Sequence, residues 1–394
     1  MIATGFIMMG VNSSFGVFFN SLVDDYSLTR ASTSAILSVR MIFSAIAALL
    51  AGWAIDRYGP RKVISVMGCF VGLSLVLTSL TEVSWQIFIT YSVLMSIGTG
   101  AVYVVITSTV LRWFDRKRGL ALGITGIGGG IGTAIISPLS ALLITTLGWR
   151  NTMRVLGGFS WLFILPTAQL LKKDPLEIGV LPDGDIPVGE SPTNKISEIT
   201  QPQIHLHQVF SNISFWAVFF IWLFMAFSSF FIMTHIVPHA IDIGFSQVES
   251  AAILSFSGIA MIVGRLVAGI ITDKVNPKGI AVVSSFIQLA AIISLVWGRE
   301  LWMLYFFGLI HGLTFGSFDT PIIVLISRSF ALNDIGKILG ILEVGIFIGG
   351  AIGPYLGGLL FDIFGSYTLA FVIMSVAVLF RIFLVFLIRP KSVS

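Results

Sequence analysis

The sequence predicts an all-α, polytopic membrane protein whose twelve transmembrane helices form two bundles of six. Three observations lead to this prediction. Only 11% of the 394 residues are charged, whereas soluble domains carry about 25%, so lipid must surround most of the chain. The apolar residues fall into twelve separate stretches close to the ~20 residues that a membrane-crossing helix needs. A polar segment in the middle leaves six stretches on each side.

Each predicted helix ends where the apolar run ends. Only helices and closed barrels satisfy the backbone in lipid, and these stretches are longer than barrel strands. In the first half the helices cover residues 2–23, 33–54, 63–80, 87–111, 120–143 and 153–171. In the second half they cover residues 215–237, 251–271, 280–297, 302–326, 338–360 and 367–388.

The polar segment, residues 172–212, is rich in Pro, Gly, Asp and Ser, which is typical of a water-exposed linker. It divides the chain into an N-terminal bundle, residues 1–171, and a C-terminal bundle, residues 213–394. Sixteen Lys and Arg residues lie in segments on the side of the termini and four on the other side. This asymmetry predicts that both termini are cytoplasmic. We expect a multi-pass, functionally monomeric protein of the cell's inner, or plasma, membrane.

Composition excludes several classes of partner. The net charge is +4, but the bases do not cluster into a stripe, so no nucleic-acid partner is expected. Cys69 is the only cysteine, so an intrachain disulfide and CxxC metal sites are excluded. No nucleotide-binding motif is present. We therefore expect no metal and no cofactor, and only a lipid bilayer and a small solute as partners.

The two halves carry similar segments after their second predicted helices. Residues 52–62 and residues 269–278 each contain a Gly, an Asp four residues later, and then basic residues. Six-helix repeats of this kind are typical of secondary transporters, whose substrate site lies between the repeats near the middle of the membrane.

The first of these segments resembles the signature loop of the major facilitator superfamily, G-x-x-x-D-R-x-G-x-R-K. The matching residues are Gly52, Asp56, Arg57, Gly59, Arg61 and Lys62. In that family the loop is a charge cluster that latches helices on the cytoplasmic side. The resemblance implies a gating role for Asp56, Arg57 and Arg61, with Asp273 as the counterpart in the second half. Alternatively, these bases only determine topology.

Within the superfamily, the sequence at the start of the fifth predicted helix is similar to the pattern that monocarboxylate porters carry there. Residues 113–123 read WFDRKRGLALG and are followed by Gly128 and Gly132. The dense glycines favour close helix packing. Residues 175–184 resemble the linker of prokaryotic relatives, including oxalate/formate exchangers. The resemblance implies a transporter of small organic anions.

Arg265 lies deep in the apolar stretch 251–271. A guanidinium there costs ~2.5–3.5 kcal/mol even on the lenient insertion scale, so such residues usually face a cavity and mark a substrate path. Its planar, permanently charged fork fits a carboxylate. The resemblance agrees, because the porters bind the substrate carboxylate through an arginine in the eighth helix. The aspartate that often precedes it by one turn, which the family links to proton movement, is replaced by Met261.

Asp319 is the candidate proton carrier. Phe318-Asp319-Thr320 resembles the family's Phe-Glu-Thr, and Asp319 reaches a depth comparable to that of Arg265. We expect the two to pair, and an arriving anion to weaken the pair so that Asp319 takes up a proton. Alternatively, the pair is a static link between helices. His311 is either a proton relay or a neutral histidine bonded to another helix.

The predicted N-terminal bundle contains further candidate binding residues, which would contact the substrate from the side opposite Arg265. Asn12, Ser13 and Ser14 offer hydrogen bonds where animal family members carry a lysine in place of Ser13. Tyr103 offers a hydroxyl, although packing or an interfacial position explains many membrane tyrosines. Arg40 is either a second cation of the site or a residue nearer the outer surface, against Asp24 or Asp25.

These residues lead us to expect a secondary active transporter of small monocarboxylates of the lactate, pyruvate or acetate type. Alternating access with proton symport is the expected mechanism, with the anion and a proton as partners. An oxalate/formate-like exchanger is the alternative, and two site cations would favour it. We do not expect an enzyme, because the histidines are scattered and form no HExxH motif. A transport-inactive nutrient sensor is a third, less favoured class.

Overall fold

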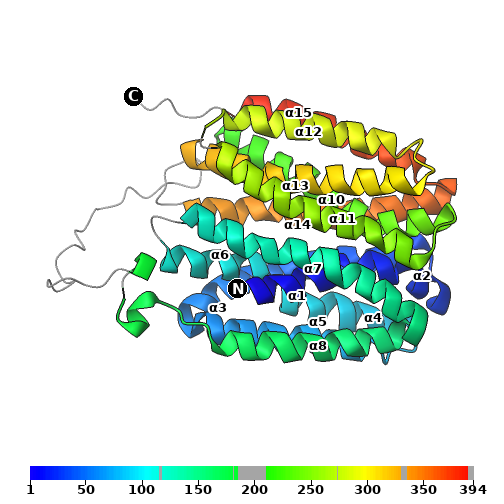
Figure 1. The fold of residues 1–394 in the computed structure, drawn as a ribbon, viewed down its shortest axis with the longest axis horizontal. Helices are drawn as coiled ribbons and strands as arrows, with labels where there is room; N and C mark the ends of the chain where they lie inside the picture. Colours follow the sequence, from blue (N-terminus) through cyan, green and yellow to red (C-terminus); the bar gives the residue numbers. More distant parts are fainter. Residues whose placement is uncertain (115–117, 181, 185–209, 273, 330–334, 389–394) are drawn as a thin grey trace.

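The computed structural model describes residues 1–114, 118–180, 182–184, 210–272, 274–329 and 335–388. Within these ranges the secondary structure is helical and contains no strand. The helices run side by side along the long axis of the molecule, with the N-terminal half below the C-terminal half in Figure 1. Helices α8 and α15 finish on the left, which we call the linker end because the linker follows α8 in the sequence. The opposite end, where α2 finishes, we call the Arg30 end.

The N-terminal half forms six membrane-crossing passes from more than six helical segments. Its helices are α1 (Ile2–Ser13), α2 (Phe15–Tyr26), α3 (Arg30–Thr78), α4 (Ser84–Ile87), the π-helical segment η1 (Phe88–Val93), α5 (Leu94–Thr99), α6 (Val102–Trp113), α7 (Arg118–Leu147) and α8 (Trp149–Gln169). The first pass combines α1 and α2, the fourth combines α4 to α6, and α3 supplies the second and third.

The C-terminal half has one helix for each pass. They are α10 (Ile213–Asp242), α11 (Gln247–Thr272), α12 (Pro277–Ser294), α13 (Leu301–Ser329), α14 (Ile335–Phe364) and α15 (Thr368–Leu387). Eleven passes of the described chain are long and apolar enough to cross a membrane. The twelfth, α8, has 21 residues and packs against α3. The predicted fold of twelve helices in two bundles of six is confirmed.

The chain reverses between the second and third passes at a single residue. Gly59 has φ +76°, inside the left-handed region, and Pro60 follows it. Glycine adopts this conformation without a steric cost, and the proline cannot continue the preceding helix. The sequence predicted a loop over residues 55–62, and the structure replaces it with this sharp kink.

The two bundles meet through three helix pairs, α7 with α11, α3 with α14, and α2 with α10. Glycines bring α7 and α11 into backbone contact. A β-carbon on Gly130 would lie 2.8 Å from the carbonyl oxygen of Gly258, and one on Gly258 would lie 2.5 Å from that of Gly130. The close packing expected from the glycines of the fifth pass therefore occurs at the interface between the bundles.

Candidate functional site

Arg265 reaches from one bundle to the other. It lies on α11, is half-buried, and its Nη1 donates a hydrogen bond of 3.1 Å to the carbonyl oxygen of Gly126 on α7. A β-carbon on Gly126 would collide with that nitrogen. The ion pairs among the described residues join Arg30 to Asp242 and Arg150 to Asp25, and none includes Arg265. A permanent positive charge thus lies between the bundles without a contacting carboxylate in the described chain.

Asp319 and Tyr103 lie within electrostatic range of this arginine, and Glu343 lies within range of Tyr103. Asp319 on α13 is half-buried and its charge interacts with that of Arg265. Tyr103 on α6 is 56% exposed and interacts with Arg265, Asp319 and Glu343. The expected pairing of Arg265 with Asp319 is present as a longer-range attraction and not as a contact ion pair.

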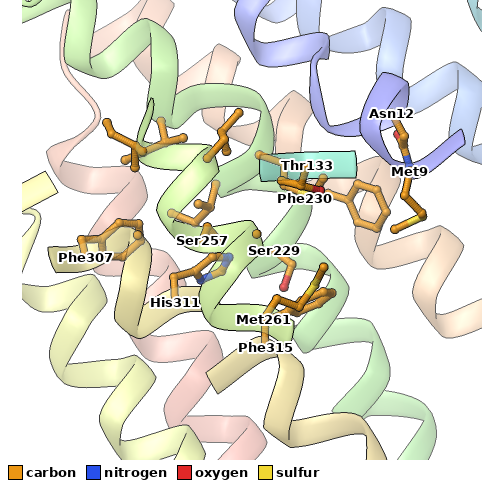
Figure 2. Close-up of a pocket in the computed structure, with 17 residues that line it drawn as sticks. Met9, Asn12, Thr133, Ser229, Phe230, Ser257, Met261, Phe307, His311 and Phe315 are labelled. Carbon is orange, nitrogen blue, oxygen red and sulfur yellow. The ribbon is translucent and has the colours of Figure 1, made fainter. Parts of the chain in front are cut away.

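A cavity of about 60 Å³ lies on the Arg30 side of this cluster, between the two bundles. Side chains of five helices line it, and Figure 2 labels ten of them: Met9 and Asn12 of α1, Thr133 of α7, Ser229 and Phe230 of α10, Ser257 and Met261 of α11, and Phe307, His311 and Phe315 of α13. Met261, which lines the cavity, is one helical turn from Arg265 on the same helix, and Arg265 itself is not among the described lining residues. A single water needs roughly 10–15 Å³, so the cavity holds a group of a few heavy atoms.

Two polar atoms in this cavity have no hydrogen-bond partner among the described residues, the Oγ of Ser229 and the Nδ1 of His311. The His311 ring stacks between Phe307 and Phe315, with centroid distances of 5.6 and 6.2 Å. The expected hydrogen bond from His311 to another helix is therefore absent from Nδ1. Both atoms are available to a polar group of a ligand.

Arg40 lies inside the N-terminal bundle and is only 1% exposed. Its Nη2 donates to the Oδ1 of Asn12, and its guanidinium lies 6.0 Å from the ring centroid of Tyr91. Its Nε and Nη1 have no partner in the described part of the chain. Asp25 pairs with Arg150 instead. Arg40 therefore contacts the cavity-lining Asn12, and no described ion pair joins it to Asp24 or Asp25.

Ser13 and Ser14 are buried and turned back onto their own helix. Their hydroxyls donate to the carbonyl oxygen of Gly10 at 3.0 and 2.7 Å. The Ser13 hydroxyl also lies 3.4 Å from that of Ser137 on α7. These contacts hold α1 in place, and the structure does not bring either serine to the lining of the cavity.

The predicted gating residues lie at the linker end. The guanidinium of Arg57 lies over the rings of Trp53 and Tyr58, and the Nε of Arg61 donates to the Oε1 of Gln169 at 2.7 Å. The side chain of Asp56 and all of Asp273 lie outside the described residues.

At the opposite end, a network that we call the Arg30 latch joins the two bundles. The guanidinium of Arg30, on α3, donates two hydrogen bonds to Asp242 of α10, at 2.7 and 2.6 Å, and one to the Tyr367 hydroxyl at 2.6 Å. The backbone N–H groups of Arg30 and Ala31 donate to Asp362 of α14. The sequence analysis did not predict this latch, because Arg30 entered it only as one of the four basic residues on the side opposite the termini. The available signal was an arginine and two aspartates at helix ends on the same predicted side.

The described hydrogen bonds that cross between the bundles occur at Arg265 and toward the Arg30 end. They include those of the Arg30 latch, the bond from Ser38 of α3 to the Ala351 carbonyl of α14, and the bond from Gln247 to the Val17 carbonyl. The structure is therefore closed at the Arg30 end.

Comparisons with known proteins agree with this architecture. The family model of the Major Facilitator Superfamily matches residues 1–301 and 298–394. "Monocarboxylate transporter 11" of Homo sapiens is 24% identical over 380 residues, covering 94% of this chain and 77% of the relative. "Uncharacterized MFS-type transporter YcxA" of Bacillus subtilis (strain 168) is 28% identical over 394 residues, covering 96% and 91%.

Solved structures share the fold at much lower identity. A bacterial homologue of the human lysosomal transporter Spinster, in an inward-facing and occupied conformation, has a TM-score of 0.74 at 14% identity and covers 98% of this chain and 94% of its own. A D-xylose-proton symporter has a TM-score of 0.74 at 14% identity, with 96% and 95% covered. The family match extends over the whole chain, and the chain belongs to the major facilitator superfamily of membrane transporters.

Proposed function

We propose that this transporter carries small monocarboxylates together with a proton by alternating access. The observation that carries the proposal is Arg265, a fixed cation between the bundles whose hydrogen bond goes to the backbone carbonyl of Gly126. A carboxylate accepts two parallel hydrogen bonds from a guanidinium, which a neutral carbonyl cannot match. An arriving anion therefore displaces a weaker partner.

The cavity next to Arg265 supports a small substrate with an apolar body. Its lining is mostly apolar, with aromatic rings and methionines, which is typical of sites that use few polar groups to orient a ligand. With the carboxylate at Arg265, a methyl group would lie in this cavity. The unpartnered Ser229 and His311 atoms would take the hydroxyl or keto oxygen of a lactate- or pyruvate-like acid. The relatives named monocarboxylate transporters support the same substrate class.

Asp319 is our candidate for the proton. It lies within range of the Arg265 charge without contacting it, so the arginine stabilises the ionised carboxylate. A bound anion would neutralise that positive charge, and Asp319 would then be more stable with a proton. Substrate and proton would thus bind together. Tyr103, opposite on α6, would contact the substrate from the N-terminal bundle.

The transport cycle follows from the same geometry. We propose that bundles 1–171 and 213–394, joined by the linker 172–212, rock about Arg265 in a monomer. With both termini in the cytoplasm, as the loop charges favour, the Arg30 latch closes the outer side. The described state would then admit substrate from the cytoplasm, and the gating residues Arg57 and Arg61 would act at that end.

Asp319→Asn is expected to abolish accumulation driven by a pH gradient while leaving exchange of internal for external substrate. The amide keeps the size of the side chain but cannot take up and release a proton. The measurement is accumulation of labelled lactate in proteoliposomes with and without a pH gradient, with Glu300→Gln, an exposed acid, as the control. Unchanged accumulation by Asp319→Asn would assign the proton to another group.

Gly126→Ala is expected to raise the KM for lactate by roughly tenfold or more, because the new methyl group displaces Arg265 Nη1. The substrate carboxylate would then lose one hydrogen bond to a charged group, which contributes ~1.5–3 kcal/mol. Gly123→Ala is the matched control, since a β-carbon there has open space on the same helix. Equal KM values for the two variants would contradict the proposed position of the guanidinium in the substrate-binding state.

The overall test is uptake of labelled lactate, pyruvate, acetate and oxalate into proteoliposomes, each with and without an imposed pH gradient. Proton symport predicts that the gradient drives accumulation of the three monocarboxylates. Uptake that does not change with the pH gradient and that requires an anion trapped inside the proteoliposomes would contradict symport.

That second outcome would favour an oxalate/formate-like exchanger. Arg40 supports this alternative, because it donates to the cavity-lining Asn12 and keeps two donor nitrogens without partners among the described residues. A second cation beside the cavity suits a dianion. Arg40→Gln would then reduce oxalate uptake more than lactate uptake.

A further inference from the structure

A second cavity, of about 300 Å³, lies at the linker end of the N-terminal bundle and is strongly basic. It lies between the kink of α3 and the segment that follows α8. Five cationic side chains and one acidic side chain line it: Arg57, Arg61, Lys62, Lys172, Lys173 and Glu177. This cavity is separate from the Arg265 site, and the transport proposal does not use its lysines.

The cavity has a defined wall. Arg61 donates to Gln169, and the Gln169 amide donates to the Ser65 hydroxyl at 3.2 Å, so the guanidinium of Arg61 is oriented by a hydrogen-bonded chain. On the other side, the indole of Trp113 donates to the Lys172 carbonyl oxygen at 3.2 Å and ties the start of the linker to α6. These hydrogen bonds hold two sides of the basic cavity in place.

The surroundings place this cavity at the membrane surface. Trp53 and Tyr58 are 57% and 48% exposed, and their rings meet edge to face at 5.7 Å. The Arg57 guanidinium lies 5.4 and 5.6 Å from their centroids. Exposed tryptophan and tyrosine residues at the end of a transmembrane helix are typical of the lipid headgroup layer. The basic cavity therefore lies at the level of lipid phosphates.

We propose that this cavity binds the phosphate headgroup of an anionic phospholipid. An arginine fork donates hydrogen bonds to two phosphate oxygens, and lysines add point charges. Each lysine or arginine of a basic pocket at a membrane surface adds to the attraction for anionic lipids. The neighbouring exposed rings favour a lipid over free phosphate, because they would contact the glycerol and acyl chains of the same molecule.

The test is binding of phosphatidylglycerol to the purified full-length protein, measured by native mass spectrometry and by the rise in melting temperature on adding the lipid. The double variant Lys62→Ala with Lys172→Ala is expected to bind phosphatidylglycerol on the order of tenfold more weakly than the wild type. The matched control is Lys274→Ala with Lys278→Ala, two lysines after α11, at the corresponding place in the C-terminal half. It should bind like the wild type.

Three further measurements test whether the variants fold, whether the lipid must be anionic, and whether free phosphate binds in its place. Equal melting temperatures of the variants in phosphatidylcholine would show that the substitutions leave the fold intact. Phosphatidylcholine should not remain bound to the protein to a comparable extent. Excess inorganic phosphate should not displace bound phosphatidylglycerol. Equal weakening in both double variants would overturn the assigned site, and complete displacement by inorganic phosphate would overturn the lipid assignment.

Discussion

Arg265→Ala is expected to abolish saturable uptake of monocarboxylates. Two charge-assisted hydrogen bonds to a carboxylate contribute roughly 3–6 kcal/mol, so uptake at low substrate concentration should fall at least about a hundredfold. The loss should be this large because the described residues that line the neighbouring cavity include no cation that could replace Arg265. The measurement is initial uptake of labelled lactate by proteoliposomes over a range of concentrations.

Two companion variants distinguish a binding role from a structural one. Arg265→Lys keeps the charge but loses the planar fork, so it should retain saturable uptake with a raised KM. Arg299→Ala removes an exposed arginine from the Arg30 side of the C-terminal bundle and should transport normally. Full activity of a well-folded Arg265→Ala protein would remove the anion site from this arginine.

Arg30→Ala is expected to open the end of the molecule that the structure shows closed. It removes the bonds to Asp242 and Tyr367 and the contact of the guanidinium with the Phe361 ring, 3.8 Å from its centroid. Two transporter states commonly differ by only a few kcal/mol, so losing a half-buried bidentate pair should shift the population measurably. The labelling rate of a cysteine beneath the latch should rise about tenfold or more.

The chain is convenient for this measurement because Cys69 is its only cysteine. In a Cys69→Ser background, Ser38→Cys places the reporter where α3 meets α14, and a membrane-impermeant maleimide reports its exposure. Arg154→Ala is the matched control, since the described hydrogen bonds of Arg154 go to Ser79 and Asn151, within its own bundle. The same labelling rate in Arg30→Ala as in the parent would contradict a gating role for the latch.

The membrane fold was largely predictable because every backbone N–H and C=O group in lipid must be hydrogen-bonded within the protein, which a helix achieves by itself. The stretch 251–271, for example, became α11, Gln247–Thr272. The sequence did not predict the breaks inside passes. The π-helical segment Phe88–Val93 contains no proline or glycine, and the junction of α1 and α2 at Ser14 interrupts an apolar run. Such breaks depend on packing against neighbours, which a hydropathy pattern does not contain.

The site was predictable in part for the same reason. The cost of a buried guanidinium identified Arg265 from the sequence, and the structure brings Asp319 and Tyr103 into its electrostatic range. Its contact with Gly126 was not predictable, because depth in the membrane does not determine how a helix is rotated. The Arg30 latch escaped prediction because Asp242 lies 212 residues away in the chain, and one sequence alone does not indicate such pairs.

The most direct test of the account is equilibrium binding of labelled lactate to the purified protein, which separates recognition of the anion from the transport cycle. We expect saturable binding to the wild type, competed by acetate and pyruvate, and loss of that binding in an Arg265→Ala protein with an unchanged melting temperature. Equal affinity in the two proteins would show that this guanidinium does not hold the carboxylate.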